Sequence, residues 1–307
     1  MIREFGFIKA LLVAGLAFTI VGGIIFAVAM TSNGWDFGVL ASHSVQKRVV
    51  EITNQEEIES VSSVKVNFST ACINIVYHNE SKITVEGYDV AKRNGEVVEK
   101  LSAKVANGEL VVTLEKIKPV NFEMGISSKR VVTIKLPKDM VVNLSVTLST
   151  GDVFVGEKGK AIAFNDATIK TSTGDVGLNG NVKCNKLSVE NTTGDTFING
   201  KLTANSFTRN ATTGDLIINA KVEAQSINVT NSTGDVICNN YITANTINIK
   251  TSTGDVILKL LGSKADYNYS YNISSGDSNI PAISNPSATK TVSVTCKTGD
   301  SNVYFEK

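Results

Sequence analysis

The stretch Ser149-Thr150-Gly151-Asp152 begins a phrase that returns, slightly varied, as far as the C-terminus. Successive copies are separated by 23, 20, 20, 20, 20, 22 and 23 residues. A period of this length is typical of proteins built from stacked structural repeats. The repeated glycines, which we expect to be structural turn residues, are Gly151, Gly174, Gly194, Gly214, Gly234, Gly254, Gly276 and Gly299.

Apolar residues recur at fixed distances from each glycine. Around Gly174 they stand two and four positions later, at Val176 and Leu178, and eight positions later at Val182. Others precede each glycine by seven and five positions, so each unit contains two or three short strands with one face inward. One such unit cannot bury its own apolar face, whereas stacked units share a core and complete each other's hydrogen bonds. We therefore predict an all-β fold, a parallel β-solenoid or β-helix of about 20-residue rungs. At ~4.8 Å per rung its repeats would form a rod of about 35 Å.

The acid after each glycine raises the question of a metal site. Gly adopts positive φ without penalty, and Asp and Ser or Thr hydrogen-bond exposed turn amides. Stacked carboxylates repel by about 1 kcal/mol per neighbour in water-like surroundings, so turn amides or bound cations must offset the repulsion. Calcium prefers six to eight oxygens, and each rung supplies one regularly placed acid. We expect no metal, the alternative being a cation row at Asp152, Asp175, Asp195, Asp215, Asp235, Asp255, Asp277 and Asp300.

A second polar row lies at another corner of the repeat. We expect its side chains to form an amide ladder. The row consists of Asn179, Asn199, Asn219 and Asn239.

The N-terminal part of the chain predicts a membrane anchor. Residues 10–30 carry no charge, which is enough to span a bilayer as a transmembrane helix. Basic residues precede this span, so we expect residues 1–9 to be a cytoplasmic stub and the bulk of the chain to be extracellular, giving a single-pass protein of the cell membrane. Ala27-Val28-Ala29 leaves a cleavable signal peptide as the alternative. Residues 31–48 follow as a spacer.

Residues 49–148 contain strand-like runs without the 20-residue period. Asn107-Gly108 between two of these runs is typical of a hairpin turn. We expect this region to be an irregular β cap that covers the first rung of the solenoid at residues 149–307, because an uncovered edge invites aggregation. At the other end, Pro281, Pro286 and the charged C-terminus are expected to blunt the last edge.

Composition narrows the possible partners. The 307 residues carry 30 basic and 29 acidic side chains, for a net charge of +1. Nucleic acid is excluded as an expected partner, because phosphate binding demands a basic face. The four cysteines lack metal-type spacing, and Cys184 and Cys238 occupy inward positions, so we interpret them as small hydrophobic residues.

Few residues depart from the repeat in a way that suggests chemistry. Arg209 occupies an inward position that holds Val or Ile in most other rungs. We expect a local shift of register that points it outward, the alternative being a buried and paired arginine. His43 and His78 have no partner suggested by spacing and are expected to be exposed. A sugar-stacking surface could be formed by Tyr241, Tyr267, Tyr269 and Tyr271, but Tyr269 and Tyr271 occupy inward positions of the repeat, so we expect core packing instead. No catalytic or cofactor-binding residues are predicted.

The sequences VKVNFSTACINIVYHNESKITVEGY (64–88) and VVTIKLPKDMVVNLSVTLSTGDV (131–153), followed by serial TSTGDV rungs, resemble the bacterial putative-adhesin family of unknown function with β-strand repeats. The resemblance covers residues 50 to 307 and implies a β-solenoid on the outer side of a membrane. Membrane-anchored members are associated with cell-envelope stress systems of Gram-positive bacteria. The family brings no catalytic residues to carry over.

These observations leave three hypotheses. The first is a non-enzymatic, membrane-anchored surface module with an adhesin-like or envelope-associated role, whose partner is an envelope protein or a surface glycan. The second is an accessory protein of an envelope-stress response. The third is a carbohydrate-active enzyme, which would need acids and bases gathered at one place, whereas here each corner repeats its neighbour. The sequence does not predict an oligomeric state.

Overall fold

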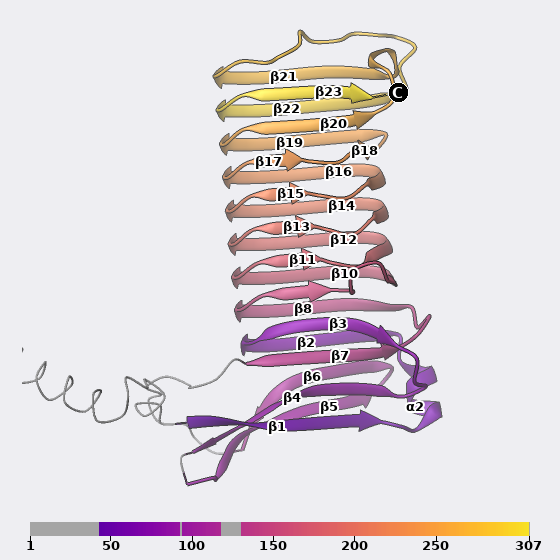
Figure 1. The fold of residues 1–307 in the computed structure, drawn as a ribbon, viewed down its shortest axis with the longest axis vertical. Helices are drawn as coiled ribbons and strands as arrows, with labels where there is room; N and C mark the ends of the chain where they lie inside the picture. The colour runs from indigo at the N-terminus through magenta and orange to yellow at the C-terminus, as the bar shows by residue number, and fades with distance from the viewer. Residues whose placement is uncertain (1–42, 93, 118–129, 307) are drawn as a thin grey trace, which may run out of the picture.

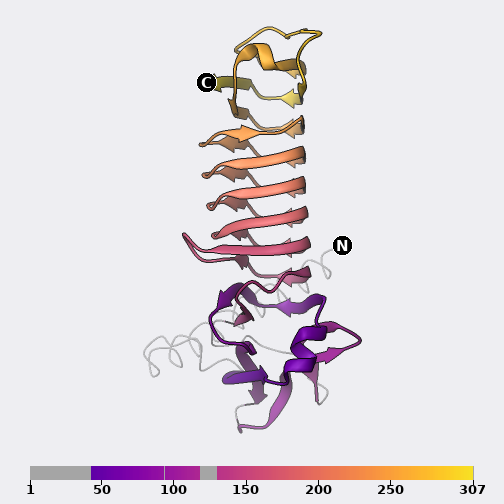
Figure 2. The same ribbon diagram turned by 90° about the vertical axis from the view of Figure 1, so that its right-hand side faces the viewer.

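The computed structural model describes residues 43–92, 94–117 and 130–306. These form a column of stacked strands that stands on a base of antiparallel strands (Figure 1). The view turned by 90° shows the column side-on, above the wider base (Figure 2). The prediction of an all-β fold is confirmed: the helical elements among the described residues are α2 (Gln55–Ser60) and the 3₁₀ turn η2 (Lys264–Asp266).

Each rung of the column consists of a long strand, a Gly-Asp corner and a short strand. Neighbouring rungs pair in parallel and in register, so that Thr196 lies beside Leu216 and Leu216 beside Val236. The long strands are β8 (Val142–Thr150), β10 (Ala161–Thr173), β12 (Asn181–Thr193), β14 (Leu202–Thr213), β16 (Val222–Thr233) and, after β18 (Ile242–Thr243), β19 (Thr246–Thr253). The short strands are β9 (Val153–Val155), β11 (Val176–Leu178), β13 (Thr196–Ile198), β15 (Leu216–Ile218), β17 (Val236–Cys238) and β20 (Val256–Leu261).

The core runs through the middle of the column. The apolar rows expected from the sequence face inward from three sides of each rung, as at Val176, Val182 and Val189, all of which are buried. Tyr269 is buried as expected and Tyr267 is buried too, but Tyr271 is 42% exposed, so its expected place in the core is wrong. Cys184 and Cys238 are buried free thiols, in agreement with their interpretation as small core residues.

The first rung of the column comes from outside the sequence repeat. It is formed by β2 (Ser63–Thr70) and β3 (Cys72–His78), which pair in parallel with β8 and β9. Thr70 lies beside Thr150, and the backbone of Ala71 lies under Gly151. This rung is invisible in the repeat because it lacks the Thr-Gly-Asp phrase.

The base closes the lower end of the column. Strands β1 (His43–Ile52), β4 (Ile83–Lys92), β5 (Val97–Ala106) and β6 (Glu109–Lys116) pair antiparallel in this order. β6 then pairs in parallel with β2, and β7 (Val131–Pro137) pairs in parallel with β3. The hairpin predicted at Asn107-Gly108 is confirmed: both residues have positive φ, 51° and 76°, between β5 and β6.

The upper end corrects the expected order of rungs. After β20 the chain skips the next level and forms β21 (Tyr267–Ser275) at the end of the column. It then returns to fill the skipped level with β22 (Lys290–Thr298), which lies between β19 and β21, and with β23 (Ser301–Glu306), which pairs with β20. The last three corners are therefore stacked in the order Gly254, Gly299, Gly276. β20 has six residues instead of three, and it continues straight where other rungs turn.

This order changes what protects the last edge. The C-terminal strand β23 lies one level below β21 and pairs with β20 on one side, while its other side meets Ser278 and Asn279. That the charged C-terminus blunts this edge stays a prediction. The outermost strand is β21, and the loop that contains Pro281 and Pro286 crosses it through two backbone hydrogen bonds between Tyr269 and Ile283, of 3.0 and 2.9 Å. A loop that occupies edge amides hinders edge-to-edge pairing.

The predicted transmembrane helix at residues 10–30, and the stub before it, lie outside the described residues. Within the described ranges, neither helical element has the length and apolar character needed to cross a bilayer.

Candidate functional site

The Asp corners are held by turn amides. The carboxylate of each Asp accepts a hydrogen bond from the backbone N–H of the next Asp up the column, as from Asp195 to Asp175 and from Asp235 to Asp215, both at 2.8 Å. The same contact continues through the reordered end, where Asp300 donates to Asp255 and Asp277 donates to Asp300. These amides offset the repulsion between stacked carboxylates. The described part of the chain contains no group of three or more His, Cys, Asp or Glu side chains placed to hold a metal ion.

The corner glycines are required for two reasons. Gly214 has φ of +132°, and a Cβ there would lie 2.0 Å from the carbonyl oxygen of Gly194 on the rung below. A side chain at this position would therefore meet both backbone strain and a backbone clash. At the opposite corner, the predicted amide ladder is confirmed: Asn199 donates to Asn179, Asn219 to Asn199 and Asn239 to Asn219, at 2.8–2.9 Å.

Arg209 lies inside the column, so the expected shift of register is wrong. It pairs in register with Val189 below and Val229 above, and its side chain is fully buried. Its Nε donates to Thr196 Oγ1 at 3.1 Å, and its Nη1 donates to Asn231 Oδ1. Its Nη2 donates to the carbonyl oxygens of Gly214 and Asp215, both at 3.1 Å.

The hydrogen bonds of the buried Arg209 guanidinium are thus accepted by backbone carbonyls and neutral side chains. Burial lowers the pKa of Arg209 to about 10, and the carboxylates of Asp195 and Asp215 on the adjacent corners act in the opposite direction. The guanidinium remains charged at neutral pH, within a closed network that solvent does not reach. Arg209 therefore ties three consecutive corners together and is not a binding residue.

The sequence contained a signal for this network that the expectation missed. Thr196 stands where the neighbouring rungs carry Val176 and Leu216, and Asn191 and Asn231 face inward on the rungs below and above Arg209. Between them, Ala211 is small. Polar substitutions on three adjacent levels, together with one small residue, indicate a buried polar cluster rather than a local shift of register.

One candidate surface, which we call the trough, runs along the broad face of the column. It has a volume of about 640 Å³ and crosses five levels, from Thr147 to Thr230. Ser172, Thr192 and Thr212 line it with hydroxyl groups. Its charged side chains, Lys170 and Glu190, form an ion pair at 2.9 Å.

A second candidate surface, which we call the basal groove, lies where the base meets the column. It has a volume of about 1050 Å³ and is lined by residues of β1, β3, β4, β7 and the start of β10. Tyr77 fixes its inner wall: its hydroxyl lies within hydrogen-bond distance of two carbonyl oxygens, those of Ala163 (3.0 Å) and Met140, which share its one proton. Burial raises the pKa of Tyr77, so the phenol stays protonated and keeps these contacts at physiological pH.

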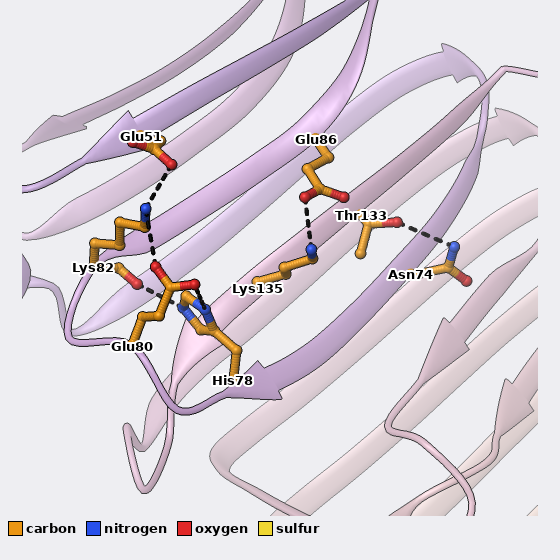
Figure 3. Close-up of polar contacts among 8 residues, drawn as sticks. All are labelled: Glu51, Asn74, His78, Glu80, Lys82, Glu86, Thr133 and Lys135. Carbon is orange, nitrogen blue, oxygen red and sulfur yellow. Dashed lines mark hydrogen bonds and ion pairs between the residues drawn. The ribbon is translucent and has the colours of Figure 1, made fainter.

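Charged side chains cross the wall of the groove that belongs to the base (Figure 3). Lys82 lies between Glu51 and Glu80, with N–O distances of 2.7 and 2.9 Å, and Lys135 contacts Glu86 at 2.6 Å. Hydrogen bonds to Glu51 and Glu80 raise the pKa of Lys82 to about 12, and the bond with Lys82 lowers the pKa of Glu80. Lys82 and Glu80 are therefore both ionised at neutral pH.

His78 differs from its expected exposure. Its side chain is 14% exposed, its Nε2 lies 2.7 Å from the carbonyl oxygen of Lys82, and its Nδ1 lies 4.0 Å from Glu80 (Figure 3). Because a carbonyl oxygen only accepts, Nε2 carries the proton of this hydrogen bond. The side chain of His43 lies outside the described residues.

Similar proteins show the same architecture. A putative adhesin from Bacteroides fragilis aligns with a TM-score of 0.50 at 17% identity, covering 85% of this chain and 97% of its own. A putative adhesin from Parabacteroides distasonis aligns with a TM-score of 0.54 at 12% identity, covering 84% and 96%. At these identities the likeness concerns the fold alone. No curated protein matches this sequence.

The family resemblance inferred from the sequence is confirmed. The model described as Toastrack DUF4097 matches residues 61–304 of the 307. The match spans the first rung, which carries no Thr-Gly-Asp phrase, as well as the repeats. This chain is a member of the Toastrack DUF4097 family.

Proposed function

We propose that this protein is a non-enzymatic, membrane-tethered surface module, a rigid parallel β-solenoid that binds an extended, hydroxyl-rich polymer such as a surface glycan in the trough. The observation that carries the proposal is the trough itself. Its hydroxyl and amide side chains recur once per level, at about 4.8 Å, so an extended chain lying along the column meets a similar set of polar partners at each step.

The polar character of the trough favours binding over catalysis. Glycoside hydrolysis uses two carboxyl groups on opposite sides of the bond that is cleaved. Among the residues that line the trough the acidic one is Glu190, which is engaged by Lys170. The two solved relatives that are called putative adhesins agree with a binding role. The uncharged stretch at residues 10–30 supports a tether to the cell membrane, with the column outside.

Photo-crosslinking in intact cells tests this proposal. A photoreactive amino acid at Thr192, in the trough, is compared with the same group at Gln225, an exposed position outside it. We expect Thr192 to capture material that periodate oxidation or glycan-degrading enzymes remove, and Gln225 to capture little. Filling the trough by Thr212→Tyr should abolish the capture, whereas Gln225→Tyr should leave it unchanged.

Two results would count against a polymer-binding trough. Equal capture at Thr192 and Gln225 would show that the trough is not a specific surface. Capture of membrane proteins alone, resistant to periodate, would favour the accessory role in an envelope-stress response instead.

A further inference from the structure

The basal groove lies between two strand ends that each lack a neighbour on one side. β10 pairs with β12 from Ala161 onward, but its pairing with β8 begins only at Phe164. β3 pairs with β7 as far as His78, but its pairing with β9 ends at Ile75. Within the described part of the chain, the segments 161–163 and 76–78 therefore have one strand neighbour each, and both line the groove.

Backbone groups of both segments face the groove. The N–H of Ala163 points away from β12 and donates to the hydroxyl of Tyr77. Residues two apart on a strand direct their amides to the same side, so the N–H and C=O of Ala161 point the same way. Ile73 donates to the carbonyl of Asp152 on the β9 side. By the same alternation, the N–H and C=O of Tyr77 point towards that side, beyond the end of β9.

Side chains give the groove an apolar strip between two charged walls. Val49 and Val141 are 46% and 47% exposed, which is unusual for large apolar residues in this fold. On the base wall, the carboxylates of Glu51, Glu80 and Glu86 outnumber their lysine partners.

The opposite wall, on the side of the column, has the reverse balance. Glu157 there is paired with Lys160. Lys138 and Lys183 are exposed and form no ion pair within the described ranges, and Asp139 is the remaining acid. The two walls therefore carry opposite excess charge.

We propose that the basal groove is a docking site for an extended peptide segment of another protein, which pairs as a short strand with the backbone groups of Ala161 or Tyr77 that face the groove. The N–H and C=O of Ala163 are already bonded to the Tyr77 hydroxyl. The peptide places an apolar side chain against Val49 and Val141 and an acidic residue towards Lys138 and Lys183. This deepens the proposed function, because it gives the module a protein partner at its base; it rests on the role as an interaction module but not on the trough.

The chemistry of the groove selects a peptide over other occupants. Free strand edges bind extended peptides through main-chain hydrogen bonds, while pockets for alternate side chains supply specificity. A glycan lacks the alternating N–H and C=O groups that such edges match. A lipid would leave the backbone groups of Ala161 and Tyr77 without partners, at a cost for each group left unpaired.

Defined peptides and the full-length protein, kept in mild detergent, provide the test. The probes are capped, fluorescein-labelled octapeptides of valine alternating with a polar residue, in acidic (Asp/Thr), neutral (Thr) and basic (Lys/Thr) forms. Each has a control in which the central valines are replaced by proline. Fluorescence anisotropy should show the acidic peptide binding at least about tenfold more tightly than its proline control, because proline removes the main-chain donors.

Two variants assign this binding to the groove. Lys183→Glu, at an exposed side chain, should reverse the preference from the acidic to the basic peptide. Ala161→Pro, at the first residue of β10 where proline is tolerated, removes the N–H that faces the groove and should weaken binding about tenfold with little change in melting temperature. The trough variant Thr212→Tyr is the matched control and should bind the peptide normally.

Three results would overturn the docking site: equal binding of the valine and proline peptides, an unchanged charge preference in Lys183→Glu, or displacement of the peptide by a neutral oligosaccharide. If these occur while the Thr192 crosslinks persist, the trough and the proposed function stand without the basal site.

Discussion

The column and the base share one hydrophobic core, but different contacts hold them. In the column, each residue lies beside the residue at the same repeat position twenty residues along the chain, as Leu216 lies between Thr196 and Val236. In the base, each strand meets a different partner, as where Val50 of β1 lies beside Val85 of β4. The column can therefore absorb an irregular residue by changing its neighbours on adjacent levels, as Arg209 shows. The base has no such copies, and it is where the larger groove forms.

The largest expected effect breaks the stacking of corners. Gly214→Ala should destabilise the protein by about 4 kcal/mol, because the new Cβ meets the Gly194 carbonyl and L residues disfavour this φ. The control is Gly159→Ala, at φ of +79° with no atom within 4 Å of its Cβ, which should cost only about 1 kcal/mol. Urea unfolding measures both. Equal losses would show that close approach between rungs is not what selects glycine.

The buried arginine gives the next effect. Arg209→Val should cost about 3 kcal/mol, because it leaves Asn231, Thr196 and the corner carbonyls without their donor. The triple variant Thr196→Val, Arg209→Val, Asn231→Ala restores an apolar interior and should recover most of that loss. Thermal unfolding of the single and triple variants measures the difference. A triple variant less stable than the single one would contradict the account of the network as a closed unit.

The junction between base and column gives a smaller, pH-dependent effect. The hydroxyl of Tyr88 donates to the carbonyl of Thr70 at 2.9 Å, and burial raises the pKa of Tyr88 to about 12. The unfolded phenol titrates near pH 10, so this group's contribution is full below pH 10 and is lost as pH rises through 12. Tyr88→Phe should cost about 1 kcal/mol at pH 8. The difference in melting temperature between Tyr88→Phe and the unmodified protein should narrow between pH 10 and 12. A gap that stays constant would show that Tyr88 ionises equally in both states.

The smallest effect separates the hydrogen-bonding role of the Asp row from its charge. Asp235→Ala removes the acceptor for the N–H of Asp255 and should cost about 1 kcal/mol. Asp235→Asn keeps an acceptor and reduces repulsion along the row, so its stability should stay within about 0.5 kcal/mol of the original. Melting temperatures of both variants are compared in calcium and in chelator. A calcium-dependent rise in melting temperature that Asp235→Asn abolishes would instead support the row of Asp side chains as a cation-binding site.

The repeat predicted the column because each glycine, Asp and inward residue has the same environment as its copies. The glycine corners and the Asn179 to Asn239 ladder follow from period alone. The prediction that Arg209 points outward was wrong because it compared Arg209 only with the apolar residues at the same repeat position. It did not consider the polar residues at other positions on neighbouring levels. The basal groove could not be predicted, because it depends on where pairing stops, at Ile75 and Phe164, between segments far apart in sequence.

The order of the last rungs was also beyond the sequence. Spacings of 22 and 23 residues fit sequential stacking as well as the observed insertion of β22 between β19 and β21. What decides the order is the straight course of β20, whose last residues Lys259–Leu261 pair with Tyr304–Glu306. That pairing joins residues 45 apart, which a local pattern does not reveal.

Spin-label distances along the column test most directly whether the corners stack one strand spacing apart, in the order Gly254, Gly299, Gly276. Genetically encoded labels at Ser172 and, in turn, Ser252, Lys297 and Ser274 sit four, five and six levels apart. At ~4.8 Å per level, the separations should be about 19, 24 and 29 Å. Separations that do not rise by one strand spacing per level, or Ser274 closer to Ser172 than Lys297 is, would contradict the stacked column described here.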